Sequence, residues 1–266
     1  YKSVRDYIYR RIQKTEGDLT KRIVLAETLM NWYHAGYFTD LLDMETQLAG
    51  LTATIVLFVE SPGSIAELGS FVMIPEIQEK LLVIMRSDHS QSNSFITTGP
   101  IKHLESQQKD RILRYPWKLS TRGKTIQKES LSDYVDEIIN HIKYRVEQTP
   151  QSAKFAPTQD AHCILLTADF IYMFEVLKFK EIMDLVSDVV KNVTNNVLHR
   201  YLQILQQLDI ISIKEIGNDR YYIAKESVGY ISYTFLMSTS KRDRDVMRWR
   251  MHFRRLNRLY DPRRIR

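Results

Sequence analysis

The sequence predicts an α/β protein in which a mostly parallel sheet carries helices on both faces, followed by a smaller domain of helices and a β-hairpin. Three observations lead to this prediction. Short apolar runs alternate with amphipathic stretches in the first half of the chain. The segment 149–159, which holds two prolines, then interrupts the periodicity. Two helical patterns and a hairpin pattern follow this break.

The elements of the first half follow from hydrophobic spacing. Val4, Ile8 and Ile12 recur at helical intervals and predict the first helix. Further helices are expected at 41–51 and from the loop after residue 60 to about residue 79, with an irregularity at Pro75, and another helix is expected after the turn-rich segment 87–100. Strands are expected at 23–25, 55–59, 82–85 and 112–114. Because strands alternate with helices, the strands should pair in parallel.

A helix with one apolar face connects the two halves. The residues of this face are Leu131, Val135, Ile138, Ile142 and Val146. We therefore expect a catalytic or ligand-binding domain at 1–125, a linker helix and boundary at 126–157, and a second domain at 158–266.

The second domain is predicted to be a winged helix. A helix at 179–190 precedes one that Thr194 or Asn195 caps, and strands at 210–216 and 221–224 flank a Gly-Asn turn. Four residues of the second helix are expected to face outward, as a DNA-reading helix would require: Asn196, His199, Arg200 and Gln203. The first three are the candidate nucleic-acid contacts. That helix is only mildly basic, so contact with the nucleic-acid backbone or with a protein is favoured over base reading.

The positive charge is concentrated in the last 26 residues. The whole chain carries 38 basic and 32 acidic residues, but Lys241 to Arg266 alone hold eleven basic and three acidic ones. This segment predicts a polyanionic partner, with Arg250, Arg254, Arg255 and Arg258 as the candidate contacts. The alternative is a solvated helical face, because Trp249, Phe253, Leu256 and Tyr260 recur at helical spacing.

Composition favours a soluble, cytoplasmic protein. No apolar run approaches the roughly 18 residues of a membrane span, and the single Cys163 cannot form an internal disulfide. The histidines show no metal-binding spacing, and neither a phosphate-binding Walker loop nor a nucleophile elbow is found. The chain begins with Tyr1 rather than Met, so its N-terminus is expected to be incomplete.

The segment from Ser61 to Phe71 is the most informative part of the chain. It follows the apolar run that ends at Val59, and a small-residue turn there would lie at the carboxyl end of a strand, where α/β sheets bind ligands. Ser61, Gly63 and Ser64 could offer hydroxyl and N–H groups to a phosphate or ribose. The alternative is purely structural, because Ser64 and Glu67 have the spacing of a capping box.

This segment resembles a known active site. Ser61-Pro-Gly-Ser-x-x-Glu-Leu-Gly-x-Phe71 is similar to the catalytic segment of the nucleoside 2-deoxyribosyltransferase superfamily. Together with Phe58-x-Glu60 and Ser94-Phe-Ile-x-x-Gly-Pro100, it most resembles the effectors of bacterial retron anti-phage systems. The resemblance covers about residues 4–115 and, more weakly, 160–260. It implies a flavodoxin-like, doubly wound sheet whose first strand would precede Tyr1, and a C-terminal winged helix.

The resemblance also implies roles for individual residues. Glu67 occupies the place of the nucleophile that attacks the anomeric carbon of the sugar. Glu45 is the candidate second acid, which would stabilise the leaving base, although it could be an ordinary surface glutamate. Glu27 and Asn93 are weaker candidates for contacts with substrate.

The implied activity is that of an N-glycosidase effector. In the retron branch the resemblance implies cleavage of NAD with release of nicotinamide, so NAD is a suspected substrate and no cofactor is expected. It also implies restraint by the retron reverse transcriptase and its branched RNA–DNA product, and a homo-oligomer that completes each site. Two alternatives stay open: a nucleoside or nucleotide deoxyribosyltransferase, and a DNA-binding regulator whose α/β domain only senses a nucleotide.

Overall fold

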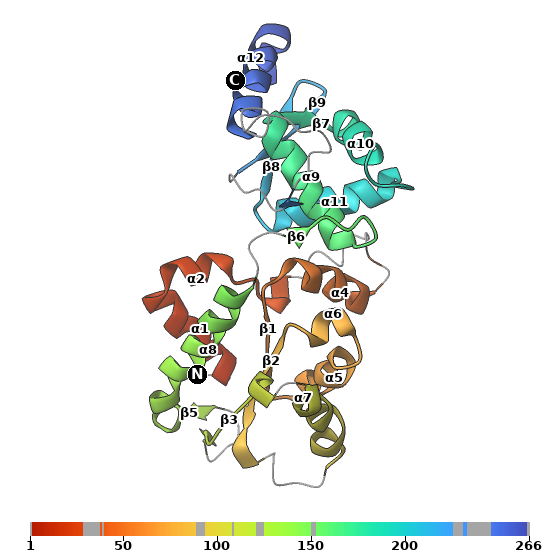
Figure 1. Cartoon of the computed structure of the whole chain (residues 1–266). Coiled ribbons are helices and arrows are strands. Elements are labelled where there is room, and N and C mark those ends of the chain that lie inside the picture. Colours follow the sequence, from red (N-terminus) through yellow and green to blue (C-terminus); the bar gives the residue numbers. More distant parts are fainter. Residues whose placement is uncertain are drawn as a thin grey trace. The chain divides into compact units, whose positions relative to one another are not determined.

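The chain folds into two compact units, each with its own sheet. The computed structural model describes residues 2–28, 38, 40–88, 94–107, 109–120, 125–149, 153–225, 231–232 and 246–264. The first unit comprises residues 1–25 and 48–149, and the second comprises residues 26–47 and 150–266 (Figure 1).

The first unit alternates helices and strands as predicted. Its helices are α1 (Val4–Thr15), α2 (Gly17–Arg22), α5 (Pro62–Phe71), α6 (Pro75–Gln78), α7 (Lys102–Gln107) and α8 (Val135–Gln148). Its strands are β1 (Ile55–Val59), β2 (Leu81–Arg86), β3 (Ile112–Tyr115) and the short antiparallel pair β4 (Lys118–Leu119) and β5 (Ile126–Gln127). The helix α4 (Leu41–Leu51) spans the division between the units.

The central sheet of this unit is parallel and has the order β1-β2-β3. Leu57 pairs with Val83, which pairs with Ile112, and all three face the same side. The predicted α/β class with parallel strands is therefore confirmed for these three strands.

Helices cover both faces of the sheet. On one face the apolar side chains of α5, α6 and α7 pack on the strands, among them Leu68, Ile77 and Leu104. On the other face the buried isoleucines of α1 and α8 do the same, for example Ile8 and Ile138. Fully burying each such side chain contributes about 1.5–3 kcal/mol, so both layers are needed to cover strands that are apolar on both sides.

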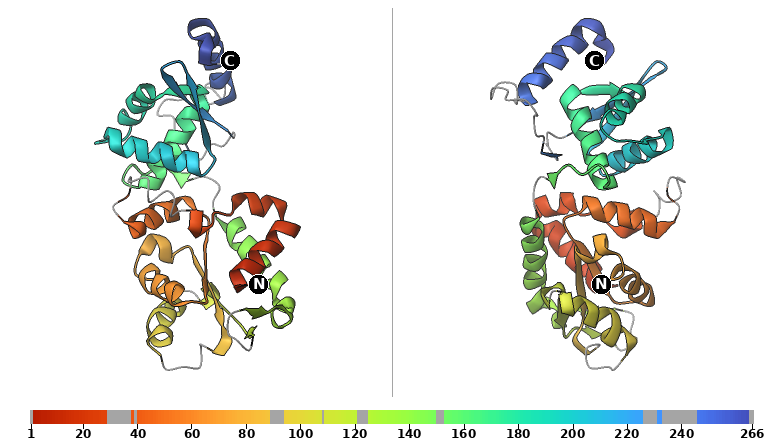
Figure 2. Two further views of the ribbon diagram at one scale, coloured as in Figure 1. Left: turned by 180° about the vertical axis from the view of Figure 1, so that it is seen from behind. Right: turned by 45° about the vertical axis from the view of Figure 1, so that its right-hand side comes forward.

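The connecting helix differs from its prediction. Instead of forming a linker, α8 belongs to the first unit, where Val135, Ile138, Ile139 and Ile142 are buried in the core. The apolar face of α8 packs against the core beside the sheet, so the helix forms part of the first unit and not a linker. Figure 2 shows α8 in green beside α1 in red in both views.

The strand predicted at 23–25 is wrong. These residues form no strand; they follow the end of α2, which Ile23 caps. Val24 is 43% exposed, and none of the described strands pairs with this segment. A run of three β-branched and apolar residues indicates a strand only where a neighbouring strand can accept its hydrogen bonds.

The irregularity predicted at Pro75 ends one helix and begins another. The helix α5 stops at Phe71, and Pro75 is the first residue of α6. Ile74 before it is extended, with φ −107° and ψ 110°, because proline disfavours the helical conformation in the preceding residue.

The second unit combines helices with an antiparallel sheet. Its helices are α9 (Asp160–Phe174), α10 (Phe179–Ser187), α11 (Asn195–Gln207) and α12 (Val246–Tyr260). Its strands are β7 (Val176–Lys178), β8 (Ile211–Ile216) and β9 (Asp219–Ala224), ordered β7-β9-β8, and a short parallel pair of β6 (Ala153–Lys154) and β10 (Ile231–Ser232). Thr194 caps α11, and the predicted hairpin turns at Gly217, whose φ is +63°.

The central helix of this unit is absent from the sequence prediction. The helix α9 contacts α10, α11 and α12, and Cys163, Ile164, Thr167 and Asp169 are among its buried residues. A helix surrounded by partners is apolar nearly all round and therefore lacks the one-sided stripe that periodicity detects. Among the described helices of both units, none is long and apolar enough to cross a membrane.

Candidate functional site

The turn after β1 is closed by a serine pair. Ser61 is the N-cap of α5, and its hydroxyl accepts a hydrogen bond from the N–H of Ser64 at 3.2 Å. The Ser64 hydroxyl accepts from the N–H groups of Glu60 and Ser61, both at 3.0 Å, and donates to the Ser61 carbonyl at 2.9 Å. Ser64 is only 9% exposed, so its hydroxyl shapes the turn and is occupied by internal partners.

Glu67 has no part in this cap. The alternative capping box of Ser64 and Glu67 is wrong, because the box is formed by Ser61 and Ser64, with Pro62 as the first helical residue. Glu67 is the sixth residue of α5 and is exposed. Within the described part of the chain its carboxylate makes no hydrogen bond or ion pair. The Glu67 carboxylate is therefore not used to cap the N-terminus of α5.

A second glutamate joins β1 to the first helix. The Glu60 carboxylate accepts hydrogen bonds from the N–H groups of Val4, at 2.6 Å, and Arg5, at 3.0 Å. Desolvation of the carboxyl group raises the pKa of Glu60, while these two N–H groups and the Arg5 charge act in the opposite direction. Glu60 thus fixes the start of α1 beside the carboxyl end of β1.

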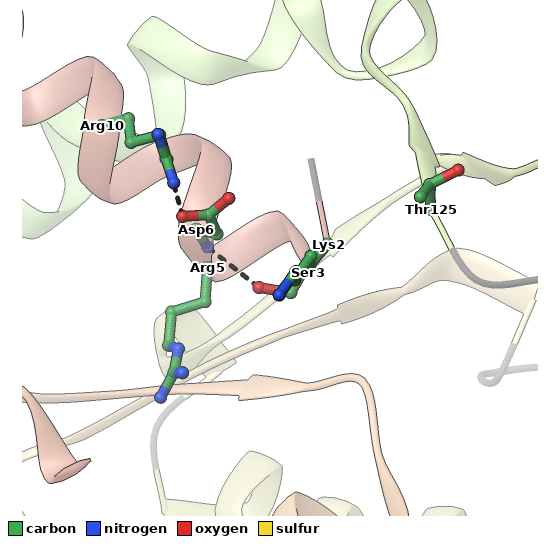
Figure 3. Close-up of a pocket in the computed structure, with 6 residues that line it drawn as sticks. All are labelled: Lys2, Ser3, Arg5, Asp6, Arg10 and Thr125. Atoms are coloured by element: carbon green, nitrogen blue, oxygen red, sulfur yellow. Dashed lines mark hydrogen bonds and ion pairs between the residues drawn. The ribbon is translucent and has the colours of Figure 1, made fainter.

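An open, basic hollow lies at this start of α1. Figure 3 shows its lining, in which Arg10 pairs with Asp6 at 2.8 Å and the Ser3 hydroxyl accepts from the Asp6 N–H. Its lining residues are Lys2, Ser3, Arg5, Asp6, Arg10 and Thr125. Glu67 is not among them. The described residues therefore leave Glu67 on an open surface rather than inside this hollow.

The other predicted substrate residues are divided between the units. Ser61, Gly63, Ser64 and Glu67 share the first two turns of α5 and the loop before it. Glu45 is half-buried in α4 and Glu27 is exposed, and both belong to the second unit. Asn93 lies outside the described residues.

On α11 two of the three predicted nucleic-acid contacts have protein partners. Arg200 is 21% exposed and pairs with Asp160 at 3.4 Å. The His199 ring stacks on Phe179, with ring centroids 4.3 Å apart. Asn196 is exposed. A hollow of about 410 Å³ beside this helix is lined by Phe179, His199, Glu215, Gly217, Asn218, Asp219, Arg220 and Tyr222.

The inward arginines of α12 dock this helix on α9. The Arg250 guanidinium lies 3.8 Å above the Tyr172 ring and pairs with Glu175 at 3.5 Å. Arg254 reaches the same carboxylate at 3.7 Å. Glu175 itself is 15% exposed and has a φ of +69°. The Phe253 ring completes the contact by packing on Phe174, with centroids 4.2 Å apart.

The residues after α12 extend this docking. Arg264 donates to both Glu181 oxygens, at 2.6 and 3.0 Å, and to the Val176 carbonyl at 3.1 Å. Arg263 pairs with Asp219 at 3.2 Å. Sequence reasoning did not identify these acidic partners, because Glu181 and Asp219 are distant along the chain and no local spacing connects them to the arginines.

Arg255 and Arg258 differ from these inward arginines. Both are exposed, as Arg254 also is, but within the described residues neither makes a hydrogen bond or an ion pair. The four arginines predicted to contact nucleic acid therefore fall into a docked pair, Arg250 and Arg254, and an outward pair.

Comparison with known proteins places the chain among retron effectors. A protein of Escherichia coli named Retron Ec73 putative ribosyltransferase/DNA-binding protein is 25% identical over 207 residues, which cover 74% of this chain and 63% of that protein. The Escherichia coli Retron Ec86 putative ribosyltransferase/DNA-binding protein is 37% identical over 75 residues, covering 28% of this chain and 24% of that protein. The chain thus spans less than two thirds of the length of these relatives. A family model described as the STM3845 retron effector protein matches residues 1–213. Since this match covers most of the 266 residues, the chain belongs to the STM3845 retron effector family.

Proposed function

We propose that this retron effector is an N-glycosidase that cleaves the glycosidic bond of a nucleotide, with NAD as the favoured substrate. The observation that carries the proposal is the state of Glu67: it stands on the helix that follows β1, and the serine pair leaves its carboxylate uninvolved in capping. The names of the two relatives, which describe ribosyl transfer, support glycosyl chemistry. The superfamily resemblance of the Ser61–Phe71 segment supplies the role of nucleophile.

The proposed reaction breaks the bond between the anomeric carbon and the ring nitrogen of nicotinamide. The bonding electron pair moves to that nitrogen, and the cationic anomeric carbon is captured by a Glu67 oxygen to form a glycosyl ester. Water then adds to the anomeric carbon and releases Glu67 as a carboxylate, with one proton passing to solvent. The N–H of Gly63, the second residue of α5, would lie near the phosphates of such a substrate.

The experiment is release of nicotinamide from NAD by the purified chain, measured by chromatography. We expect Glu67→Gln to lower the rate by at least about 1000-fold, because it keeps the shape and removes the nucleophilic charge. Glu76→Gln is the matched control, since Glu76 is an exposed carboxylate on α6. Activity that survives Glu67→Gln would refute the assignment of Glu67.

We further propose that a second copy of the chain completes the site. Glu67 is exposed in the single chain, and glycosyl transfer requires a site from which bulk water is excluded. Light scattering should therefore find a dimer or larger oligomer, and oligomer and activity should be lost together on dilution. A monomer with full activity would refute this part of the proposal.

A deoxyribosyltransferase is the second candidate, because the relatives are named for ribosyl transfer. Glu45 distinguishes the two reactions. The pyridinium nitrogen of NAD becomes neutral when it leaves and needs no proton, whereas the base of a purine deoxynucleoside leaves readily only when it is protonated. With Glu45 as the proposed acid, Glu45→Gln should impair deoxynucleoside cleavage more than NAD cleavage. Assays with both substrates test this.

For the second unit we propose a winged-helix fold and a nucleic-acid partner. Two observations support the winged helix: the element order α9, β7, α10, α11, β8, β9 and the sheet order β7-β9-β8. For the first unit we propose a doubly wound fold, which the helices on both faces of the sheet β1-β2-β3 support. The relatives are named as DNA-binding proteins. We propose the retron reverse transcriptase and its branched RNA–DNA as the restraining partners in the cytoplasm. Their assembly with the effector should weaken as salt rises.

A further inference from the structure

We propose that the outer face of α12, and not the surface formed by α11 and the β8–β9 hairpin, is the main nucleic-acid contact of this effector. We define the outer face as Arg248, Met251, Arg255 and Arg258. These residues are separated by three, four and three positions, so they form one stripe along the helix. The inference rests on the proposed nucleic-acid partner and assigns it a location.

The charge of α12 is unusual for a solvated surface helix. From Val246 to Tyr260 it contains five arginines and no acidic residue, whereas surface helices usually pair basic residues with acidic ones one turn away. The inward pair, Arg250 and Arg254, shares the single carboxylate of Glu175. The positive charge of the outward pair, Arg255 and Arg258, is presented to solvent.

The surface of α11 and the hairpin offers less to a phosphate backbone. Arg200 is held by Asp160, and His199 is stacked on Phe179. The hollow between α11 and the hairpin turn includes the carboxylates of Glu215 and Asp219. Glu215 pairs with Arg220 at 2.7 Å, so the charge of this arginine is offset by a neighbouring carboxylate.

The chemistry of the outer face favours nucleic acid over a membrane. A helix that lies in a lipid surface needs an uninterrupted apolar side, and the Phe253 side of α12 is already packed on α9. The outer face is a row of arginines around Met251, which is 71% exposed. The other exposed apolar residues of α12 are distributed around the helix and do not form one apolar side: Met247, Trp249, Leu259 and Tyr260. Guanidinium groups bind phosphates, and a thioether between them can contact sugars and base faces.

The test is binding of the full chain to short fluorescein-labelled single-stranded DNA and to the matching duplex, by anisotropy at several salt concentrations. We expect Arg255→Gln/Arg258→Gln to weaken binding roughly 10- to 100-fold at 0.1 M salt, because two phosphate contacts are lost. The slope of log affinity against log salt should fall by about 1.4 for the single strand and 1.8 for the duplex. Arg255→Lys/Arg258→Lys should retain most of the binding.

Two matched variants separate location from net charge. Lys180→Gln/Lys191→Gln removes two exposed charges from the same unit, outside α12, and should leave affinity within about twofold. Asn196→Ala/His199→Ala tests the α11 surface, and its effect should also be small.

The outcomes keep the inference apart from the proposal on which it rests. If the wild-type chain binds DNA and Arg255→Gln/Arg258→Gln binds it as tightly, the outer face of α12 is not the main contact, although nucleic acid remains the partner. The same conclusion follows if Asn196→Ala/His199→Ala loses more affinity than the double glutamine variant. Absence of binding by the wild-type chain would overturn both. Binding to anionic lipid vesicles in place of DNA, lost in the same variant, would overturn nucleic acid as the occupant.

Discussion

At the scale of single residues, Ser64 shows how a motif serves the fold and the site together. Its buried hydroxyl accepts two backbone N–H groups and donates to a carbonyl. These bonds hold the turn that presents α5, so the small side chain is required for its hydrogen bonds as much as for its size.

Replacing Ser64 with alanine should therefore destabilise the first unit. We expect a loss of about 1–2 kcal/mol in the free energy of unfolding, because two part-buried backbone N–H groups lose their acceptor. Urea denaturation measures this change. Ser70→Ala, on the exposed side of the same helix, should change stability by less than about 0.5 kcal/mol, and equal losses in both variants would contradict the role given to Ser64.

The single thiol should be inert in the folded chain. Cys163 is 1% exposed, and burial, together with the nearby charge of Asp160, raises the pKa of its thiol. Since only the thiolate reacts, a thiol reagent at pH 8 should modify the native chain far more slowly than the chain in denaturant. Rapid modification without unfolding would show that α9 is not packed as described.

At the scale of secondary-structure elements, a substitution at Gly63 distinguishes a structural role of the first turn of α5 from a ligand-binding role. It is the second residue of α5, and a β-carbon there would meet only the Ser61 hydroxyl, at 3.7 Å. The fold therefore accepts a larger residue at this position. An effect of a larger residue at Gly63 on activity would therefore report on substrate binding and not on folding.

Gly63→Ala should keep or raise stability by up to about 1 kcal/mol, since alanine favours helix. Under the proposed function the added methyl group lies where substrate phosphates approach, so KM for NAD should rise while kcat changes less. Thermal unfolding and steady-state kinetics test both parts. An unchanged KM would indicate that the substrate does not approach this backbone.

The sequence predicts well the helices with one solvent-facing side, the short apolar runs of the parallel strands and the hairpin. The helix at Val4–Thr15 and the hairpin around Gly217 follow from periodicity and turn chemistry. The helix α9 was missed because partners surround it, and the strand at 23–25 was wrongly predicted because no neighbouring strand is available to pair with it. Burial from all sides and pairing depend on contacts that a local pattern does not contain.

The candidate site shows the same division. The Ser61–Phe71 motif and the serine cap are local, so the sequence predicts the turn, although Ser61 and Ser64 form the capping box and Glu67 takes no part in it. The acidic partners of Arg250, Arg254 and Arg264 come from other elements. Local spacing therefore predicted a set of basic residues but not which of them the fold would neutralise.

At the scale of the whole molecule, two compact units imply two unfolding events. Ile138 is fully buried in the first unit and Ile164 in the second. Each Ile→Ala change should cost about 2–5 kcal/mol, from lost burial and a residual cavity.

Calorimetry should then show two transitions, of which Ile138→Ala lowers one and Ile164→Ala lowers the other. The effects should stay separate because the two side chains belong to different hydrophobic cores. A single transition that both variants lower equally would mean that the units unfold as one cooperative structure.

The left-handed backbone at Glu175 has a consequence for the C-terminal helix. Glycine would suit this φ, and any other side chain costs about 1–2 kcal/mol there. The residue present is nevertheless a glutamate, whose carboxylate forms ion pairs with Arg250 and Arg254 of α12. A Glu175→Gly chain would thus relieve the strain in its own backbone and lose the ion pairs with Arg250 and Arg254. The last helix would then be held by the remaining contacts, among them those of Phe253 with Phe174 and of Arg264 with Glu181, so strain at one residue is exchanged for weaker attachment of a whole helix.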